Sequence, residues 1–338
     1  MPITTNPSSH SPIDIAILAL DGAVYSSIVG PMDVFSVANV LRETNGLQAF
    51  ARVRVLKLGR RQPLSFNRIR IHTHGRIDTD DRFDVIIVPA MMQVSETQVP
   101  PGPPQLVVWL RRQHARGACL SSVCAGSFML AQTGLLDGRS ATTHWNLADQ
   151  FSESYPRVRL QPQKMLIDEH DLITAGGVTA YFDLALHLVR RFDSADLAAG
   201  CSKFLLIDPR RSSQSPYQAG QFRKSHADSA VLELQEYLEQ HFSDHLTLEQ
   251  MSRTAGLEQR TLLRRFRKAT GDSPVLYLQR IRIEAARRHL ELSQDSIEEI
   301  AWKVGYEDGS SFNRLFKKIT GMSPGGYRKK FSLVVRPA

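Results

Sequence analysis

Cysteines and long apolar runs are scarce in this chain. Only three cysteines occur in 338 residues, Cys119, Cys124 and Cys201, and no two of them form a CxxC pair. So small a set, with an odd number of cysteines, excludes a disulfide framework and is typical of a protein in a reducing compartment. No run of about 18 apolar residues is present, which excludes a membrane-spanning helix. Because residues 1–12 are polar and lack the apolar centre of a secretory signal, we expect a disordered tail there and a cytoplasmic protein.

Motifs for nucleotides and metals are missing as well. The chain has no Walker-type phosphate loop, and Ala175-Gly176-Gly177 lacks the spacing of a dinucleotide loop, so a turn between a strand and a helix is the simpler interpretation. His72-Thr73-His74 has no third metal ligand near it in sequence and is better explained as part of a surface strand pair. We therefore expect no metal and no cofactor.

Positive charge, in contrast, is abundant. The formal net charge is +8, from 42 lysines and arginines against 34 acidic residues, which suits a polyanionic partner without naming it. A hydrophobic content of 42% is sufficient for real cores, and the length predicts two domains.

One sequence pattern near the C-terminus occurs twice. The copies are TLEQMSRTAGLEQRTLLRRFRKATGDSP, residues 247–274, and SIEEIAWKVGYEDGSSFNRLFKKITGMSP, residues 296–324. Each contains a glycine, Gly256 or Gly305, that can take the left-handed conformation of a tight turn. Each ends in Thr-Gly-x-Ser-Pro, and the second copy has one extra residue between its glycine and its phenylalanine.

Each copy has the pattern of a helix-turn-helix, over 248–269 and 297–319. The second helix should cover about 258–269 in one copy and 308–319 in the other, with one apolar and one basic face. Its apolar stripe consists of Leu262, Phe266 and Ala269, or Phe312, Phe316 and Ile319. A helix packed on one side and basic on the other fits the major groove of DNA. An ordinary solvated helix with a positive face is the alternative, and the repetition argues against it.

Residues from about 230 to 330 resemble the DNA-binding domain of AraC/XylS-type transcriptional regulators. The resemblance implies two helix-turn-helix units joined by a long helix, here from Pro274 to about Leu292. It also implies that the early exposed positions meet base edges and that later basic residues bind phosphates. The positions expected to contact DNA are Arg260, Leu263, Arg264, Arg267, Lys268, Gly309, Ser310, Asn313, Arg314 and Lys317.

The N-terminal part alternates between strand and helix patterns, which predicts a parallel sheet with helices on both faces. The expected strands are 13–20, 52–59, 83–90 and 118–123, with two more in 157–177; the expected helices include 28–42, 104–116 and 178–193. We predict an α/β domain over 13–207, a polar linker over 208–228 and an all-α domain over 229–330.

Cys124 lies in Ser122-Val123-Cys124-Ala125-Gly126, between an apolar strand and a helix. A side chain at such an elbow is lifted clear of the sheet, and the helix N-terminus favours the thiolate. His144 follows twenty residues later and could reach the thiol, and Cys with His is a minimal nucleophilic pair. The alternative is that Cys124 is a small buried hydrophobe and His144 a structural residue.

Residues 13 to about 190 are similar to the PfpI/ThiJ superfamily, which is related to class I glutamine amidotransferases. The elbow around Cys124, the Thr143-His144 step and Gly30-Pro31-Met32-Asp33-Val34-Phe35 carry the resemblance. It implies a flavodoxin-like fold, with Cys124 and His144 on the superfamily's functional positions. Fusion to an AraC-type domain is the arrangement of GlxA-like regulators.

Two departures from the superfamily's enzymes affect the expected chemistry. Ser27 stands where they place a glutamate beside the cysteine, and it cannot supply that charge or proton. Ala90-Met91 stands where they tend to have Gly-Gly, whose amides serve as oxyanion donors. We therefore expect a ligand pocket with no catalytic residues. Its expected lining is Cys124, His144, Ser27, Ala90 and Ala125.

These observations predict a sequence-specific transcriptional regulator, an activator, whose N-terminal domain senses a small metabolite. The expected partners are double-stranded operator DNA, a small-molecule effector, RNA polymerase and a second copy of the chain, with no membrane. The alternative is an active Cys-dependent amidase, peptidase or glyoxalase-like hydrolase fused to a DNA-binding domain. A structural DNA binder without sequence preference is a third interpretation, which the base-facing Arg and Asn positions disfavour.

Overall fold

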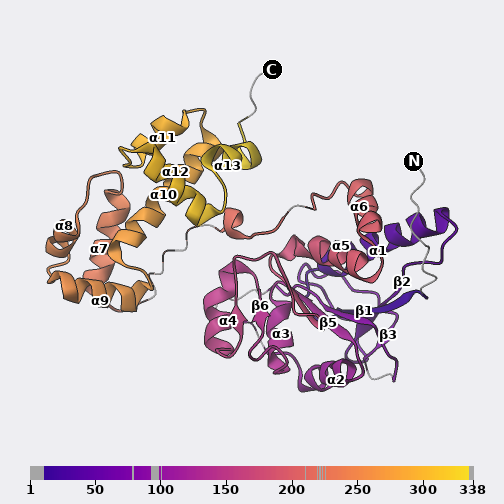
Figure 1. Cartoon of the computed structure of the whole chain (residues 1–338). Helices are drawn as coiled ribbons and strands as arrows, with labels where there is room; N and C mark the ends of the chain where they lie inside the picture. Colours follow the sequence, from indigo (N-terminus) through magenta and orange to yellow (C-terminus); the bar gives the residue numbers. More distant parts are fainter. Residues whose placement is uncertain are drawn as a thin grey trace. The chain divides into compact units, whose positions relative to one another are not determined.

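The computed structural model describes residues 11–77, 80–92, 99, 101–209, 211–218, 220, 222, 224 and 226–334. The chain divides into two compact units, Met1–Gln214 and Ser215–Ala338 (Figure 1). The division falls within the segment 208–228, for which the sequence predicts a linker. The exact domain limits stay a prediction.

A seven-stranded sheet forms the centre of the first unit. Its strand order is β3-β2-β1-β4-β5-β9-β8, and its pairings are parallel except between β8 and β9. The strands are β1 (Ile13–Ala19), β2 (Ala51–Lys57), β3 (Gly75–Arg76), β4 (Val85–Val88), β5 (Cys119–Val123), β8 (Leu166–Asp168) and β9 (Leu172–Ala175). The central order β2-β1-β4-β5-β9 is that of a flavodoxin-like doubly wound sheet. The predicted fold class is therefore confirmed.

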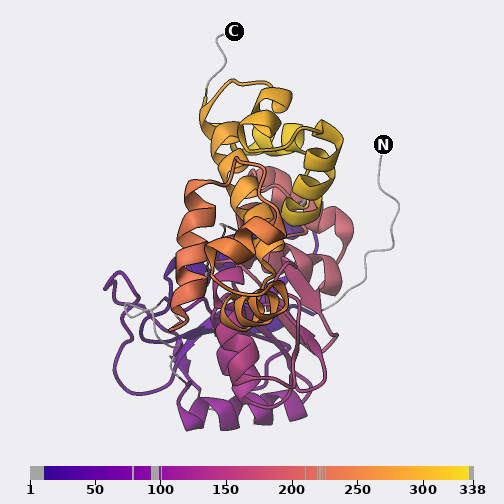
Figure 2. The same ribbon diagram turned by 90° about the vertical axis from the view of Figure 1, so that its left-hand side faces the viewer.

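Helices cover both faces of this sheet (Figures 1 and 2). On one face α1 (Ser26–Thr44), α5 (Tyr181–Phe192) and α6 (Ala195–Phe204) pack on one another. On the other face lie α2 (Pro104–Ala115) and α3 (Gly126–Gln132), which contact β5. The central strands are buried on both faces, which explains their continuous apolar sequences.

Shorter elements complete the first unit. They are β6 (Ser140–Ala141), η1 (Trp145–Leu147), α4 (Ala148–Ser154), β7 (Arg159–Leu160) and η2 (Val178–Ala180). The strands β6 and β7 pair in parallel as a small second sheet. The predicted helix at 178–193 is thus divided into η2 and α5. Helix α6 was not among the predicted elements, although Ser194 provides its N-cap by accepting a hydrogen bond from the amide of Leu197.

The second unit is helical. It consists of η3 (Ser215–Tyr217), α7 (Ser229–Gln240), α8 (Leu248–Thr254), α9 (Gln259–Thr270), α10 (Pro274–Leu292), α11 (Ile297–Lys303), α12 (Gly309–Thr320) and α13 (Pro324–Phe331). Helix α10 contributes Tyr277 to the core around Phe266 and Leu290 to the core around Phe316. The predicted joining helix and both helix-turn-helix units are confirmed. Within the described part of the chain, none of the helices combines the length and apolarity needed to cross a bilayer.

The repeated Thr-Gly-x-Ser-Pro ends one helix and begins the next. Gly271 takes a left-handed conformation after α9, and the hydroxyl of Thr270 donates to the carbonyl of Phe266 at 2.8 Å. Ser273 then caps α10 by accepting from the amide of Leu276, and Pro274 occupies the first helical position, where no N–H is needed. The second copy repeats each of these features at residues 320–324.

Both turn glycines have the predicted left-handed backbone, with φ of 60° at Gly256 and 85° at Gly305. Their surroundings differ. A Cβ atom at Gly256 would meet nothing within 4 Å, whereas one at Gly305 would lie 2.6 Å from the carbonyl oxygen of Ser243. The second turn therefore requires glycine for steric space as well as for its dihedral angle.

Candidate nucleic-acid interface and elbow site

Helix α9 presents its predicted DNA-contacting residues to solvent. Leu262 and Phe266 are fully buried, so the helix is held by its apolar stripe. The opposite face exposes all five predicted contacts, Arg260, Leu263, Arg264, Arg267 and Lys268. The structure thus leaves four cationic groups and one apolar side chain free to approach a groove.

Helix α12 has the same arrangement with a different chemistry. Phe312 and Phe316 are buried, and the predicted contacts Ser310, Asn313, Arg314 and Lys317 are exposed, with Gly309 half-buried at the helix start. Asp308 caps this helix by accepting from the amides of Ser310 and Ser311. A hydrogen bond from the Ser311 side chain, together with those two amides, lowers the pKa of the Asp308 carboxyl group to about 2. The two helices share a backbone pattern but present different side chains at matched positions.

Arg265 differs from its basic neighbours on α9. Its guanidinium group is not directed to solvent but donates two hydrogen bonds to the Asp228 carboxylate, at 2.9 Å and 2.6 Å. Asp228 also caps α7 by accepting from the amide of Val231. Arg265 therefore fastens α9 to α7, a role that a sequence separation of 37 residues conceals.

The predicted elbow exists at Cys124. This residue follows β5 with a φ of 54°, and α3 begins two residues later. A Cβ atom at Gly126 would lie 2.4 Å from the carbonyl oxygen of Pro89, so α3 packs closely over the end of β4. Cys124 is held by its amide, which donates to the carbonyl of Ala175 at 2.8 Å.

The thiol of Cys124 does not match the expected reactivity. Cys124 is 3% exposed, and the neighbouring Ala125 is buried as well. Burial raises the pKa of the thiol to about 12, although a hydrogen bond from the amide of Ala125 acts in the opposite direction. The expectation that the helix terminus favours the thiolate is therefore wrong, because desolvation outweighs the single amide donor.

Two of the predicted pocket residues, Ser27 and Ala90, are bonded to each other. The hydroxyl of Ser27 accepts from the amide of Ala90 at 3.0 Å and donates to the carbonyl of Val24 at 2.7 Å. Both residues are fully buried. The amide at the position where related enzymes have oxyanion donors is thus already paired within the chain.

His144 lies next to the elbow but does not bond to its thiol. Its Nδ1 accepts from the amide of Asn146 at 3.1 Å, which caps η1, and burial lowers the pKa of the imidazole. Thr143 links the two segments, because its hydroxyl donates to the carbonyl of Cys124 at 3.2 Å. No hydrogen bond joins the side chains of Cys124 and His144, both of which the structure describes.

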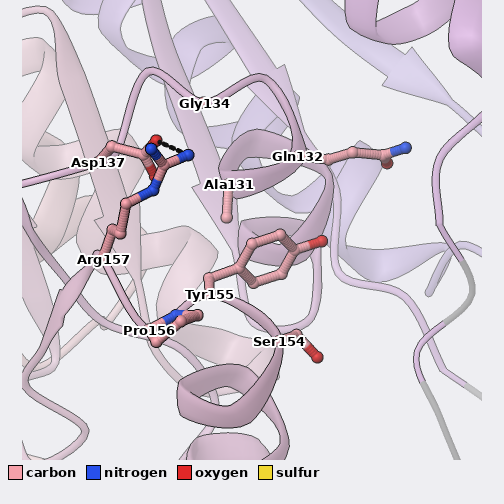
Figure 3. Close-up of a pocket in the computed structure, with 8 residues that line it drawn as sticks. All are labelled: Ala131, Gln132, Gly134, Asp137, Ser154, Tyr155, Pro156 and Arg157. Atoms are coloured by element: carbon pink, nitrogen blue, oxygen red, sulfur yellow. Dashed lines mark ion pairs between the residues drawn. The ribbon is translucent and has the colours of Figure 1, made fainter.

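A cavity of about 300 Å³ lies elsewhere, at the far end of α3 (Figure 3). None of the five predicted pocket residues lines it. Its lining is Ala131, Gln132, Gly134, Asp137, Ser154, Tyr155, Pro156 and Arg157. Asp137 and Arg157 form an ion pair at its edge, at 2.7 Å.

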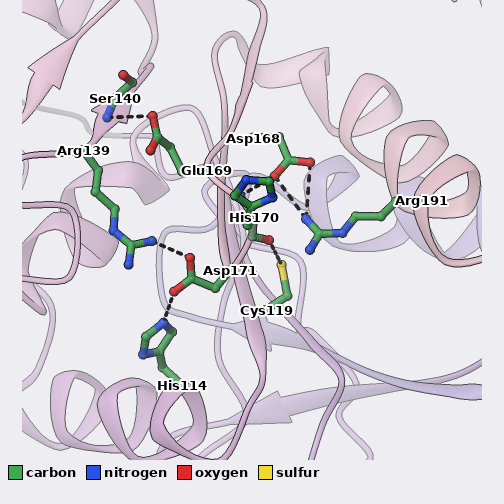
Figure 4. Close-up of polar contacts among 9 residues, drawn as sticks. All are labelled: His114, Cys119, Arg139, Ser140, Asp168, Glu169, His170, Asp171 and Arg191. Carbon is green, nitrogen blue, oxygen red and sulfur yellow. Dashed lines mark hydrogen bonds and ion pairs between the residues drawn. The ribbon is translucent and has the colours of Figure 1, made fainter.

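Charged groups also gather at the turn between β8 and β9 (Figure 4). Asp171 pairs with Arg139 and, at 2.6 Å, with His114. Asp168 pairs with Arg191 at 3.1 Å. This cluster lies near the amino-terminal end of β5, whereas the elbow follows its carboxyl-terminal end. The ion pairs connect the β8–β9 hairpin to the neighbouring segments. Among the described residues, no group of three or more His, Cys, Asp or Glu side chains is arranged to hold a metal ion.

The geometry thus combines an α/β unit that carries an elbow cysteine with a helical unit that exposes the basic faces of two helix-turn-helix helices. Two family models match the chain, the DJ-1/PfpI family over residues 14–191 and a helix-turn-helix domain over residues 251–330. The chain therefore belongs to the DJ-1/PfpI family and carries an AraC-type helix-turn-helix domain.

Relatives that span both units are named as transcriptional regulators. The HTH-type transcriptional regulator CdhR of Pseudomonas aeruginosa is 30% identical over 297 residues, which cover 87% of this chain and 86% of CdhR. GbdR of the same species is 26% identical over 324 residues, covering 96% of this chain and 86% of GbdR. GlxA of Rhizobium meliloti is 30% identical over 224 residues, which cover 65% of this chain and 68% of GlxA. The chain is a DNA-binding regulator of this type.

Two solved structures have a fold similar to large parts of this chain. An AraC family transcriptional regulator from Pseudomonas putida matches with a TM-score of 0.50 and 23% identity over 57% of this chain and all of that one. A ThiJ/PfpI family protein from Pseudomonas syringae matches with a TM-score of 0.51 and 21% identity, covering 76% of this chain and 98% of that one.

Proposed function

We propose that this protein is an effector-responsive, sequence-specific transcriptional activator that acts in the cytoplasm. Helices α9 and α12 read base edges, and the α/β unit binds a small metabolite. The observation that carries the proposal is the matched exposure of Arg264 and Arg314 on two helices whose apolar stripes are buried. Arginine binds guanine through two hydrogen bonds, and Asn313 can bind adenine in the same manner.

We propose that the elbow binds its ligand without covalent chemistry. A buried thiol with a raised pKa is a poor nucleophile, and the amide of Ala90 is already bonded to Ser27. The predicted pocket of Cys124, His144, Ser27, Ala90 and Ala125 remains our proposed effector site. Homodimer formation and contact with RNA polymerase stay predictions from the resemblance.

The test is a binding-site selection from random duplexes with the full-length chain at moderate ionic strength. We expect recovery of one motif with two half-sites, one for each helix-turn-helix. Binding to the recovered motif should be at least about 10³-fold tighter than to random duplex. Equal affinity for the motif and for random duplex would contradict the proposal and favour a structural DNA binder.

A further inference from the structure

The side chain of Gln214 occupies a buried slot lined by oxygen atoms. It is 2% exposed, at the last position of the first unit. Its Nε2 donates toward the carbonyl oxygens of Thr143 at 2.8 Å, Pro162 at 2.9 Å and Lys164 at 3.1 Å, and toward the hydroxyl of Thr142 at 3.3 Å. A carboxamide nitrogen has only two hydrogens, so the slot offers more acceptors than Gln214 can satisfy.

The carboxamide oxygen of Gln214, unlike its nitrogen, lacks a hydrogen-bond partner among the described residues, and it is buried. Burying an unpaired acceptor is unfavourable. A ligand group with donors alone, such as an ammonium or guanidinium cation, would satisfy the same oxygens without burying an unpaired one.

Glycine at position 176 makes room for this side chain. A Cβ atom at Gly176 would lie 2.2 Å from Nε2 and 2.3 Å from Cδ of Gln214, whereas one at Gly177 would lie 3.9 Å from Oε1. Gly176 does not have a positive φ. Close approach of the carboxamide, and not the backbone conformation, therefore explains why this position is glycine.

The slot connects to the elbow through one residue. Thr143 accepts from Gln214 through its carbonyl group, and its hydroxyl donates to the carbonyl of Cys124 at 3.2 Å. The hydroxyl of Ser127, on α3, donates to the hydroxyl of Thr143 at 2.8 Å. A ligand that displaces Thr143 or His144 would thus disturb the hydrogen bonds that hold the Gln214 side chain.

The next residue along the chain is anchored in the second unit. The guanidinium group of Arg287, which is buried, donates to the carbonyls of Ser215 and Gln218. Tyr217 packs its ring against Phe331 at 5.3 Å. Gln214 is thus bonded within one unit, and its neighbour in sequence, Ser215, is bonded within the other.

We propose that Gln214 is an internal latch, and that an effector bearing an ammonium or guanidinium group competes with it for the oxygen-lined slot. Release of Gln214 frees the junction at Ser215 and changes operator affinity. This inference rests on the proposed function and specifies its ligand class and its coupling. The size of the response is set by the difference in effector affinity between the latched and released states.

Two variants and two matched controls test the latch in the full-length chain. Gln214→Ala removes the carboxamide, and Gly176→Ala expels it without changing Gln214. Gln163→Ala removes an exposed amide but keeps the backbone carbonyl that accepts from the amide of Gln214, and Gly177→Ala adds a methyl group at ordinary contact distance. Hydrogen exchange across residues 211–218 should accelerate at least about tenfold in the first two variants and stay unchanged in the controls.

Chemical rescue tests the chemistry of the slot. Gln214→Ala deletes a group with the composition of acetamide, so acetamide on the order of 0.1 M should restore protection in that variant. Acetate has the same shape without N–H donors and should not. In the wild-type chain, ethylammonium should accelerate exchange at 211–218, whereas tetramethylammonium, of equal charge and without N–H, should leave it unchanged.

Operator binding gives the functional readout. Gln214→Ala and Gly176→Ala should shift the operator Kd in the same direction by at least about fivefold. Unchanged exchange, rescue by acetate equal to rescue by acetamide, or equal effects of Gly176→Ala and Gly177→Ala would overturn the latch. If Gln214→Ala fails to fold, Gly176→Ala and the ethylammonium comparison decide the question. If exchange responds as expected but the chain selects no motif, the proposed function fails and the latch stands.

Discussion

At the scale of single residues, the elbow and the recognition helices give the most direct tests. Cys124 has the positive φ of an activated nucleophile, but burial raises the pKa of its thiol to about 12. At pH 8 the thiolate fraction is then about one in ten thousand. We expect no measurable alkylation of Cys124 by iodoacetamide in the native chain within minutes, and rapid alkylation in denaturant, as read by peptide mass spectrometry.

The other cysteines provide an internal control for this measurement. Cys119 and Cys201 are also buried, with thiol pKa values raised to about 11. All three should react together only on unfolding. Fast native alkylation confined to Cys124, and lost in His144→Ala, would revive the hydrolase interpretation.

Arg264 and Lys317 should contribute to DNA binding in different ways. Arg264→Ala should relax preference at one or two base pairs, by about 1–3 kcal/mol per pair, since it removes a base contact. Lys317→Ala should weaken binding to all sequences alike and reduce the salt slope by about one, since it removes a phosphate contact. Selection and salt titration of both variants check this. If both variants kept the base preference and the salt slope of the wild type, the assignment of Arg264 to a base and Lys317 to a phosphate would be refuted.

At the scale of elements, the turns of the two helix-turn-helix units should tolerate substitution unequally. Gly256→Ala should cost roughly 1–2 kcal/mol of unfolding free energy, because alanine disfavours a positive φ. Gly305→Ala should cost about 1–3 kcal/mol more, because its methyl group would also meet the carbonyl of Ser243 at 2.6 Å. Calorimetric unfolding of the full chain measures both. Equal losses would show that the second turn relaxes.

The β8–β9 hairpin should make stability depend on acid pH. Burial alone would raise the pKa of Asp171, but hydrogen bonds from Arg139 and His114 outweigh it and hold the pKa at about 2. Because this pKa lies below the unfolded value of about 3.9, the contribution is complete above about pH 4 and is lost as the pH falls toward 2. With the carboxylate 40% exposed, we expect under about 1 kcal/mol.

The matched comparison is Asp171→Asn against Glu153→Gln, an exposed carboxylate on α4. The free energy of unfolding, measured by denaturant titration, should fall less steeply between pH 4 and pH 2 for Asp171→Asn than for the wild type. For Glu153→Gln it should fall as steeply as for the wild type. A slope unchanged by Asp171→Asn would mean that these contacts contribute nothing to stability.

At the scale of the whole molecule, one helical unit holds both DNA readers. Helix α10 packs into the cores of both helix-turn-helix units, so the two recognition helices cannot move independently. They should address successive major grooves, about 34 Å apart along the duplex. Inserting five base pairs between the half-sites turns one to the opposite face and should reduce affinity to that of a single half-site. Unchanged affinity in a gel-shift titration would contradict this geometry.

Much of this organisation is readable from the sequence because it depends on local patterns. The duplicated turn glycines, the serine caps and the apolar stripes each act within a few residues. The parallel sheet follows from continuous apolar runs alternating with helical segments. The two-residue strand β3 was missed because so short an element has no periodic signal. Helix α6 was missed although it has ten residues and a serine N-cap.

The amino-acid sequence by itself determined the two-part architecture, the paired recognition helices and the elbow at Cys124, since periodicity, capping and turn chemistry are local properties. Only the tertiary structure decided the state of the thiol, the pairing of Arg265 with Asp228 and the burial of Gln214 beside Thr143. Those features depend on solvent exclusion and on contacts between residues 37 and 71 positions apart. No short-range pattern carries that information.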